Sequence, residues 1–326
     1  MSHIQWGYAL NQWKPQFDDF VRREEHDRAF KTISIAGFTG VELTAASGRW
    51  EPFGNPQQIV ANFGSVAGLR AALADCGIEA VSSMFFDPQQ RFVERLMPPY
   101  SPIVAEDLDA IVSNAEWLAE ALAELGGSVL VVAGAPEASE VTDTDQAVAQ
   151  LARCWSAVGT ATARFGVRTA VHMDFLSALR RPGALDALLD ATDPELVGLV
   201  VDTAELQVAG IDPVAFIRRH RDRIVHVHLK DALAVDEAGE YEAPHAKYVV
   251  RQRGGERGIP RWFAEPGVRG GLVDIDGVIE ALVQADYSGW VVVESDQSPH
   301  PATSALLAGY VLQRRLQPLV SGPAAS

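Results

Sequence analysis

The sequence has little cysteine and no long apolar run. Cys76 and Cys154 are the only cysteines among 326 residues. They lie far apart in stretches of helical period, so we expect buried free thiols rather than a disulfide or a thiolate metal site. No apolar stretch approaches the about 18 residues of a membrane span, and the first residues lack a basic segment followed by an apolar one. We therefore expect a cytoplasmic protein that does not interact with membranes.

Basic residues are scarce relative to acidic ones. The chain has 27 Lys and Arg against 43 Asp and Glu, which gives a formal net charge of −16. A surface that binds nucleic acid needs clustered Lys and Arg. Arg251, Arg253, Arg257 and Arg261 form one basic cluster, interrupted by Glu256 in a Gly-rich stretch. Either this cluster meets an anionic or polyhydroxylated small ligand, or it is a solvated loop. No nucleic-acid partner is expected.

Apolar runs typical of strands alternate with amphipathic segments of helical period along the chain. Such alternation favours a parallel sheet with crossover helices. No Gly-x-Gly-x-x-Gly follows the first run, which disfavours a dinucleotide-binding sheet. The predicted strands are Gln5–Leu10, Gly40–Leu43, Ile78–Ser83, Ser128–Ala133, Arg168–Met173, Leu196–Val201, Ile224–Leu229 and Trp290–Glu294.

Eight such strands predict an α/β fold, a single (β/α)8 TIM barrel over residues 1–320, followed by a disordered tail at 321–326. A long irregular insert, about Ala232–Gly271, follows the seventh strand, and loops of that length on the active face of a barrel are usually functional. The clearest predicted helices are Pro56–Asp75, Ala105–Leu125, Thr144–Phe165, Pro213–His220 and Ile275–Ala285.

Acids and histidines stand at or just after the ends of four of these strands. The C-terminal ends of barrel strands meet at one face, so their side chains can converge on a single point. Oxygen and nitrogen ligands without thiolate suit a divalent cation, with Mn²⁺ as the first candidate and Mg²⁺, Co²⁺ or Zn²⁺ as alternatives. The four strand ends are Val171–Asp174, Val200–Thr203, Val225–Asp231 and Val292–Asp296.

Two of these strand ends contribute a carboxylate that is costly to bury without a partner. Asp202 either binds the cation or caps the helix that follows it. Glu294 needs a metal, a Lys or an Arg, and Asp296 lies two residues further on the same face.

His226 and His228 share a face of their strand, because side chains two residues apart point the same way. His228 lies nearer the rim of the barrel, so we assign it the metal role and give His226 a buried, hydrogen-bonded role. Lys230 is one step further on that face, where it contacts a substrate oxygen or pairs with Asp231.

The fifth strand offers both His172 and Asp174. Either can complete a four-ligand set, with the other transferring protons, a role that suits His at neutral pH. Our assignment takes Asp174 as the ligand and His172 as a catalytic residue, together with Glu205 and Lys230.

Substrate contacts are predicted at three further positions. Asn11 and Trp13 follow the end of the first strand, and Arg261 lies in the long insert.

Several segments occur in an order and spacing that resemble the xylose-isomerase-like barrel superfamily of sugar isomerases, epimerases and dehydratases, and within it the inosose dehydratases. The resemblance covers nearly the whole chain and is sharpest from Gly166 to Pro299. The segments that carry it are Asp202-Thr203, Ala209–Pro213, Arg223–Asp231, Phe263–Gly267, Gly271–Asp274 and Tyr287–Glu294.

The resemblance implies metal ligands from strands five to eight, usually Glu, Asp, His and Glu. The last three correspond to Asp202, His228 and Glu294. At the first, this chain departs from the pattern, because the usual Glu position falls on His172. Glu205 also stands where the inosose dehydratases have His.

The resemblance further implies a metal-dependent lyase that removes an α-proton from a cyclic keto-polyol or keto-sugar and eliminates a β-substituent. The α-subunits of C-glycoside deglycosidases, which act with a small β-subunit, are a second resemblance. An isomerase or epimerase is an alternative, because it would share the same proton-abstraction step. A non-catalytic scaffold is another, and it would pair the strand-end acids with Lys or Arg. We expect a homo-oligomer, or a hetero-oligomer with a small second subunit.

Overall fold

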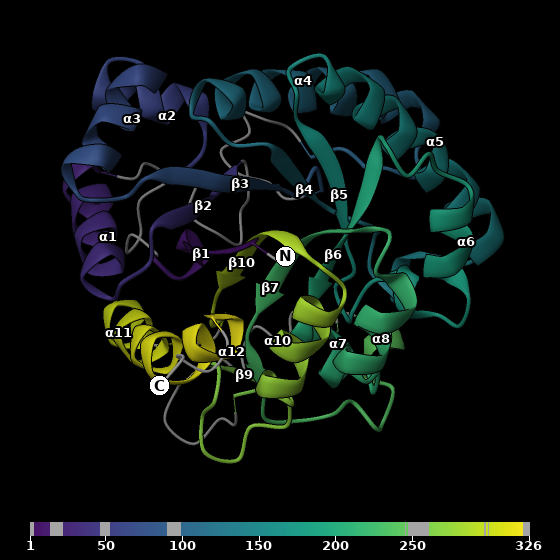
Figure 1. Ribbon diagram of the computed structural model, residues 1–326. Coiled ribbons are helices and arrows are strands. Elements are labelled where there is room, and N and C mark those ends of the chain that lie inside the picture. The colour runs from purple at the N-terminus through teal and green to yellow at the C-terminus, as the bar shows by residue number, and fades with distance from the viewer. Residues whose placement is uncertain are drawn as a thin grey trace.

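Eight parallel strands close into a barrel at the centre of the molecule (Figure 1). The computed structural model describes residues 3–13, 22–45, 53–89, 99–244, 246, 261–296, 298 and 300–321. The strand order around the barrel is β1-β10-β7-β6-β5-β4-β3-β2, which confirms the predicted fold. The strands are β1 His3–Ala9, β2 Gly40–Ala45, β3 Ala80–Phe86, β4 Val129–Ala133, β5 Arg168–His172, β6 Val197–Asp202, β7 Ile224–Leu229 and β10 Ser288–Val293.

Helices surround the strands in Figure 1 and cover their outer surface. No helix among the described residues has both the length and the apolar character needed to cross a membrane. The α-helices are α1 Arg23–Ile35, α2 Pro56–Phe63, α3 Val66–Asp75, α4 Leu108–Glu124, α5 Thr144–Ala163, α6 Ala184–Asp190, α7 Thr203–Val208, α8 Pro213–His220, α10 Ile275–Gln284, α11 Pro301–Val311 and α12 Gln317–Ser321.

Short 3₁₀ segments occur at several strand and helix ends, and one π-helical turn joins α11 to α12. The 3₁₀ segments are Leu10–Gln12, Ala105–Asp107, Ala138–Glu140, Ala178–Arg180 and Glu240–Glu242, and the π-helical turn is Leu312–Leu316.

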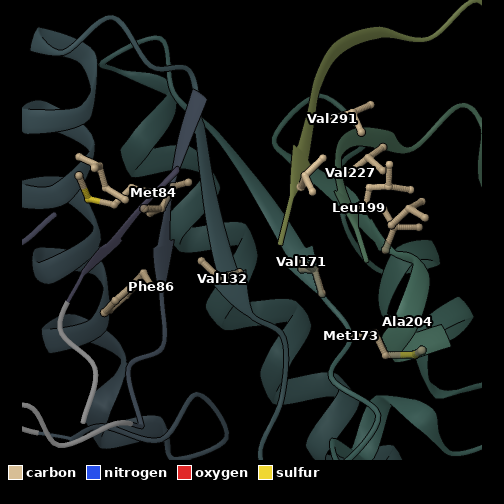
Figure 2. Packing of buried hydrophobic residues seen from close by; sticks show 14 of the residues in the cluster. Met84, Phe86, Val132, Val171, Met173, Leu199, Ala204, Val227 and Val291 are labelled. Atoms are coloured by element: carbon tan, nitrogen blue, oxygen red, sulfur yellow. The ribbon is translucent and has the colours of Figure 1, made fainter. Parts of the chain in front are cut away.

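The main core lies between the strands and the helices. Val171, Leu199, Val227 and Val291 come from four strands and belong to one buried cluster with helix residues (Figure 2). Since strand side chains alternate between faces, Val227 faces the helices while its neighbours His226 and His228 face the barrel interior. The interior near the strand centres holds a small separate cluster of Val129, Val131, Ala170 and Val200. Polar side chains at the strand ends lie above this apolar layer.

The predicted helix Pro56–Asp75 is two helices. Gly64 adopts a left-handed conformation with φ of 78° and ends α2, and the Ser65 side chain accepts from Gly68 N to begin α3. The apolar periodicity continues across the break, so periodicity alone did not locate it. A glycine followed by serine is a stop signal and a start signal in succession.

The third strand starts later than predicted, at Ala80 rather than Ile78. Ile78 N donates to Leu73 O at 2.9 Å, which closes the end of α3. Gly77, with φ of 80°, makes that turn. The eighth barrel strand also ends one residue earlier than predicted, at Val293, and Glu294 follows it.

The long insert after β7 contains a small hairpin of β8 Asp231–Ala232 and β9 Phe263–Ala264. Asp231 joins the start and the end of this insert, because its carboxylate accepts hydrogen bonds from the backbone N–H groups of Ala232, Gly267 and Val273. Residues 245 and 247–260 lie outside the described part, including Arg251, Arg253 and Arg257 of the basic cluster.

Two smaller predictions have mixed outcomes. Both cysteines are free, as expected; Cys154 is buried, but Cys76 is only partly buried because it caps the end of α3 beside a turn. Ser321 closes α12, and residues 322–326 of the predicted tail lie outside the described residues.

Candidate active site and metal centre

Four strand ends bring buried acids and histidines together, as the sequence predicted. His172 is the last residue of β5, Asp202 the last of β6, His228 the penultimate residue of β7, and Glu294 follows β10. His172 Nε2 lies 3.0 Å from Asp202 Oδ2. His228 Nδ1 lies 3.7 Å from the same oxygen and 3.6 Å from Glu294 Oε1. These atoms surround one point on the active face of the barrel.

Asp202 caps the helix that follows it, one of the two roles that its position suggested. Oδ1 caps α7 by accepting from Ala204 N at 3.1 Å and Glu205 N at 3.0 Å. Oδ2 faces His172 and Lys230 instead. Burial alone would raise the pKa of Asp202, but the charge of Lys230 and the hydrogen bond with His172 outweigh it and hold the pKa well below its usual value. Asp202 is therefore a carboxylate fixed by its cap, with one oxygen directed at the site.

Lys230 is buried among the carboxylates of the site. Its Nζ lies 2.7 Å from Glu294 Oε1, 2.6 Å from Asp296 Oδ2 and 2.9 Å from Asp202 Oδ2. Burial would lower the pKa of Lys230, but these charges, Asp202 first, raise it well above its usual value. The alternative pairing with Asp231 is not what the structure shows, since that carboxylate is used by the backbone of the insert. The surrounding carboxylates therefore favour the charged form of Lys230.

Asn11 positions the two acids that follow β10. Its Nδ2 donates to Glu294 Oε2 at 2.7 Å and to Asp296 Oδ1 at 2.7 Å. Burial raises the pKa of Glu294 to about 7, with Asp296 adding to the rise and Lys230 and His228 opposing it. The predicted substrate contact Asn11 thus lines the cavity while it also holds the side chain of Glu294.

Of the two candidates on the fifth strand, His172 lies beside Asp202. His172, Asp202 and His228 form one group of potential ligand atoms within 4.8 Å of one another. Asp174 lines the same cavity, and its Oδ1 accepts from Leu176 N at 2.8 Å. Both candidates of the fifth strand therefore line the cavity, and His172 reaches Asp202.

Glu205 is held at the edge of the cluster. Its Oε2 accepts from Phe175 N at 2.9 Å, and its Oε1 lies 3.4 Å from Lys230 Nζ. Burial raises the pKa of Glu205 well above its usual value, and the nearby Asp174 adds to the rise. Glu205 lines the cavity with His172 and Lys230, so the three residues predicted to be catalytic share one space.

The other two predicted substrate contacts do not line that cavity. Trp13 is buried and packs edge-on against Tyr8, with ring centroids 5.8 Å apart. Arg261 Nη2 donates to Ser295 Oγ at 2.8 Å, and Arg261 Nη1 lies 3.3 Å from Glu265 Oε2. Their role as substrate contacts stays a prediction.

Sequence reasoning missed Glu42 on β2. Its Oε2 lies 3.0 Å from His228 Nε2 and 3.1 Å from His226 Nε2, and it accepts from Ser83 Oγ at 2.6 Å. Burial would raise the pKa of Glu42, but the charges and hydrogen bonds of His228 and His226 hold it far below its usual value. The sequence did contain a signal for Glu42, because a Glu inside the apolar run Gly40–Leu43 needs a buried partner.

The residues at the strand ends fit a divalent cation. His228 Nε2 is engaged by Glu42, and its buried Nδ1 has no hydrogen-bond partner among the described residues. An imidazole lone pair that faced two carboxylate oxygens would be repelled, so Nδ1 requires either a proton or a cation in front of it. His172 Nδ1 is also buried without a partner there. Mixed oxygen and nitrogen donors without thiolate suit Mn²⁺, Mg²⁺, Co²⁺ or Zn²⁺.

Residues 30–310 match the xylose isomerase-like TIM barrel family. The chain belongs to that family. An inosose dehydratase of Lacticaseibacillus casei is 30% identical over 159 residues, which is 49% of this chain and 50% of that protein. An inosose dehydratase of Geobacillus kaustophilus is 30% identical over 265 residues, 78% of this chain and 80% of that protein.

The chain spans about half the length of several of these relatives, and 50% of the Lacticaseibacillus protein is covered. Among solved structures, a sugar phosphate isomerase/epimerase from Parabacteroides distasonis superposes with a TM-score of 0.66 at 15% identity, covering 98% of this chain and 96% of that one. This likeness concerns the fold.

Proposed function

We propose that the protein is a divalent-metal-dependent lyase that eliminates a β-substituent from a cyclic keto-polyol or keto-sugar. The observation that carries the proposal is the convergence of His172, Asp202, His228 and Glu294, with the unpartnered Nδ1 of His228 facing two carboxylates. The similarity to inosose dehydratases supports this substrate class.

In this proposal His172, Asp202, His228 and Glu294 hold the cation. The first of these replaces Asp174, which the sequence suggested, because His172 is the side chain that lies beside Asp202. A bound cation would supply electrophilic activation of a ketone, which acidifies the neighbouring C–H.

Asp174 and Glu205 transfer the protons, because both line the cavity outside the ligand group. One carboxylate takes the proton from the carbon next to the ketone, and the C–H electron pair forms the new C=C bond as the β C–O bond breaks. The departing oxygen keeps the electrons of that bond and receives a proton from the other carboxylic acid. When the leaving group is hydroxide, the net product is water.

Lys230 and Asn11 keep the acids in place during this chemistry. Lys230 Nζ contacts Glu294 and Asp296, and Asn11 Nδ2 donates to the same two residues. Each acid is thereby held by a cation and by a neutral donor, which restricts its rotation before substrate binds. Preorganised groups of this kind cost no reorganisation during the reaction.

Incubation with scyllo-inosose and with a 3-keto-C-glycoside, followed by mass spectrometry, tests the reaction. Loss of water from the first substrate supports the proposal. Release of an aglycone from the second would identify a deglycosidase instead, and copurification of a small second subunit would accompany it. A product isobaric with its substrate would identify an isomerase or epimerase.

A non-catalytic scaffold is a second candidate, and a specific contact favours it. Lys230 pairs with Asp202 and Glu294 as that hypothesis requires, at 2.9 and 2.7 Å. Metal analysis of the purified protein separates the two. A stoichiometric divalent metal supports the enzyme, and metal-free protein that binds none of the four cations supports the scaffold.

A further inference from the structure

We propose that Glu42 is a positioning residue that fixes the orientation of His228 and so presents its Nδ1 to the cation. The inference rests on the proposed metal site. It adds a residue from β2, a strand that contributes no proposed ligand, and it assigns which nitrogen of His228 binds the metal.

The contacts of Glu42 lie in the barrel interior. Its side chain is 2% exposed, and its Oε2 lies 3.0 Å from His228 Nε2. An ionised carboxylate only accepts hydrogen bonds, so the atom it meets on His228 must be an N–H. Nε2 of His228 therefore carries hydrogen.

The other ring nitrogen follows from this contact. With Nε2 directed at Glu42, Nδ1 points to the opposite side of the ring, 3.7 Å from Asp202 Oδ2 and 3.6 Å from Glu294 Oε1. Metal-binding histidines usually donate their second N–H to a carboxylate or carbonyl, which fixes both tautomer and ring angle. Glu42 supplies that acceptor to His228.

If Glu42 served only to hold His226 in the barrel interior, its loss would matter little, because His226 has a second hydrogen-bond partner. Its Nε2 lies 3.1 Å from Glu42 Oε2 and also 3.1 Å from Ser83 Oγ. Removing the carboxylate would leave His226 a hydroxyl partner, whereas His228 Nε2 would lose the partner shown for it. The contact with His228 is thus the one that depends on Glu42.

Two irregularities in the sheet bring these groups together. The pairing of β2 with β3 shifts between Val41 and Glu42, which places Ser83 opposite Glu42. The pairing of β6 with β7 shifts between Leu199 and Val200, which places His226 opposite Val200 and His228 opposite Asp202. Local shifts of register re-aim side chains and are enriched beside active sites.

The test measures metal binding rather than turnover. Glu42→Gln keeps the shape of the side chain and removes its charge, and Ser83→Ala is the matched control because it removes a partner of Glu42 without touching His228. Zn²⁺ is the probe, with dissociation constants measured by competition with a chelator. Nitrogen-15 NMR of histidine-labelled protein reports which ring nitrogen of His228 binds the metal.

In the wild type we expect Zn²⁺ on Nδ1 of His228 and hydrogen on Nε2. Glu42→Gln should weaken Zn²⁺ binding by about 10- to 100-fold, the range found for such partners of metal ligands, while Ser83→Ala stays within about threefold of wild type. Zn²⁺ on Nε2 in the wild type overturns the inference, and that measurement does not require the variant to fold. Equal Zn²⁺ affinity for wild type and a folded Glu42→Gln also overturns it.

Failure of the proposed function gives a different pattern. Zn²⁺ bound through Nδ1, weakened by Glu42→Gln, in a protein that eliminates nothing from any keto substrate would refute the lyase and leave Glu42 its positioning role. A wild-type protein that binds no Zn²⁺, Mn²⁺, Mg²⁺ or Co²⁺ would overturn the metal centre and this inference together.

Discussion

The ammonium group of Lys230 and the carboxylate of Glu294 are 2.7 Å apart, and the oxygen that joins them, Oε1, is also the one that faces His228 Nδ1. A cation at the proposed site must therefore share this oxygen with Lys230. The lysine balances the negative charge of the site, and it would compete with a metal at the proposed site for the same oxygen atoms.

Lys230→Met should destabilise the metal-free protein. The substitution leaves Asp202, Glu294 and Asp296 without their buried cation, and breaking a buried ion pair on one side costs about 3–5 kcal/mol. Urea unfolding in the presence of a chelator measures the loss. Arg164→Met, which breaks an exposed pair with Glu116, should cost less than about 1 kcal/mol. Equal losses for the two variants would contradict the assigned role of Lys230.

The same variant should gain more from metal than the wild type does. With the competing ammonium removed, Zn²⁺ or Mn²⁺ has unshared access to Asp202 Oδ2 and Glu294 Oε1. At a given metal concentration, tighter binding to the folded state stabilises it more, so the rise in Tm on adding metal should be larger for Lys230→Met. An equal or smaller rise would mean that lysine and metal do not compete.

His228→Ala and Glu294→Ala should each abolish tight metal binding while the fold is retained. Both remove an atom that faces the proposed cation site. His220→Ala is the control, since His220 lies near Asp186 on the outer helices, with its Nε2 3.7 Å from that carboxylate. Elemental analysis of the purified proteins gives the metal content. Unchanged content in the first two variants would disprove the site.

Asp236 should make stability depend on pH in the acidic range. Burial would raise the pKa of Asp236, but its hydrogen bond and ion pair with Arg180 lower it. Because the folded pKa is below the unfolded one, the pair stabilises the protein above about pH 4, and this is lost as pH falls through the folded value. Asp236→Asn should cost about 2 kcal/mol at pH 7, and the difference from wild type should shrink towards pH 3.

Gly271→Ala should disturb the base of the long insert. A Cβ there would lie 2.0 Å from Asp231 Oδ2, the carboxylate that accepts from Gly267 N and, through Oδ1, from Val273 N. We expect a loss of about 2 kcal/mol, in the range for buried groups that lose hydrogen bonds. Gly270→Ala meets no atom within 4 Å but has φ of 85°, so about 1 kcal/mol is expected. Urea unfolding ranks the two, and an effect at Gly270 as large as at Gly271 would contradict the steric role of Asp231.

The alternation of strands and helices could be predicted from the sequence because its signals depend on residues close together in the chain. Strand residues such as Val225, Val227 and Leu229 and the glycines that end helices act within a few neighbours, so the chain order itself predicts a parallel barrel. Where two local signals disagreed, prediction failed: the apolar period ran through Gly64 and Ser65, and the conformation of Gly64 broke the helix.

Part of the candidate site could also be predicted from the sequence. Asp202, His228 and Glu294 could be proposed because strand ends of a parallel barrel all meet at one face. The choice between His172 and Asp174 as the fourth ligand stays a prediction, and the structure adds that His172 Nε2 lies 3.0 Å from Asp202 Oδ2. The expected cytoplasmic location, the oligomeric state and a second subunit stay predictions.

The sequence by itself determined the barrel, the face on which the acids gather and the chemical character of the side chains there, since each follows from neighbours in the chain. Only the tertiary structure decided which groups touch. Glu42 and His228 are 186 residues apart, and Lys230 and Glu294 are 64 apart. Their contacts exist because closing the barrel and shifting the register of two strand pairs bring distant strands within hydrogen-bonding range. No local pattern encodes those distances.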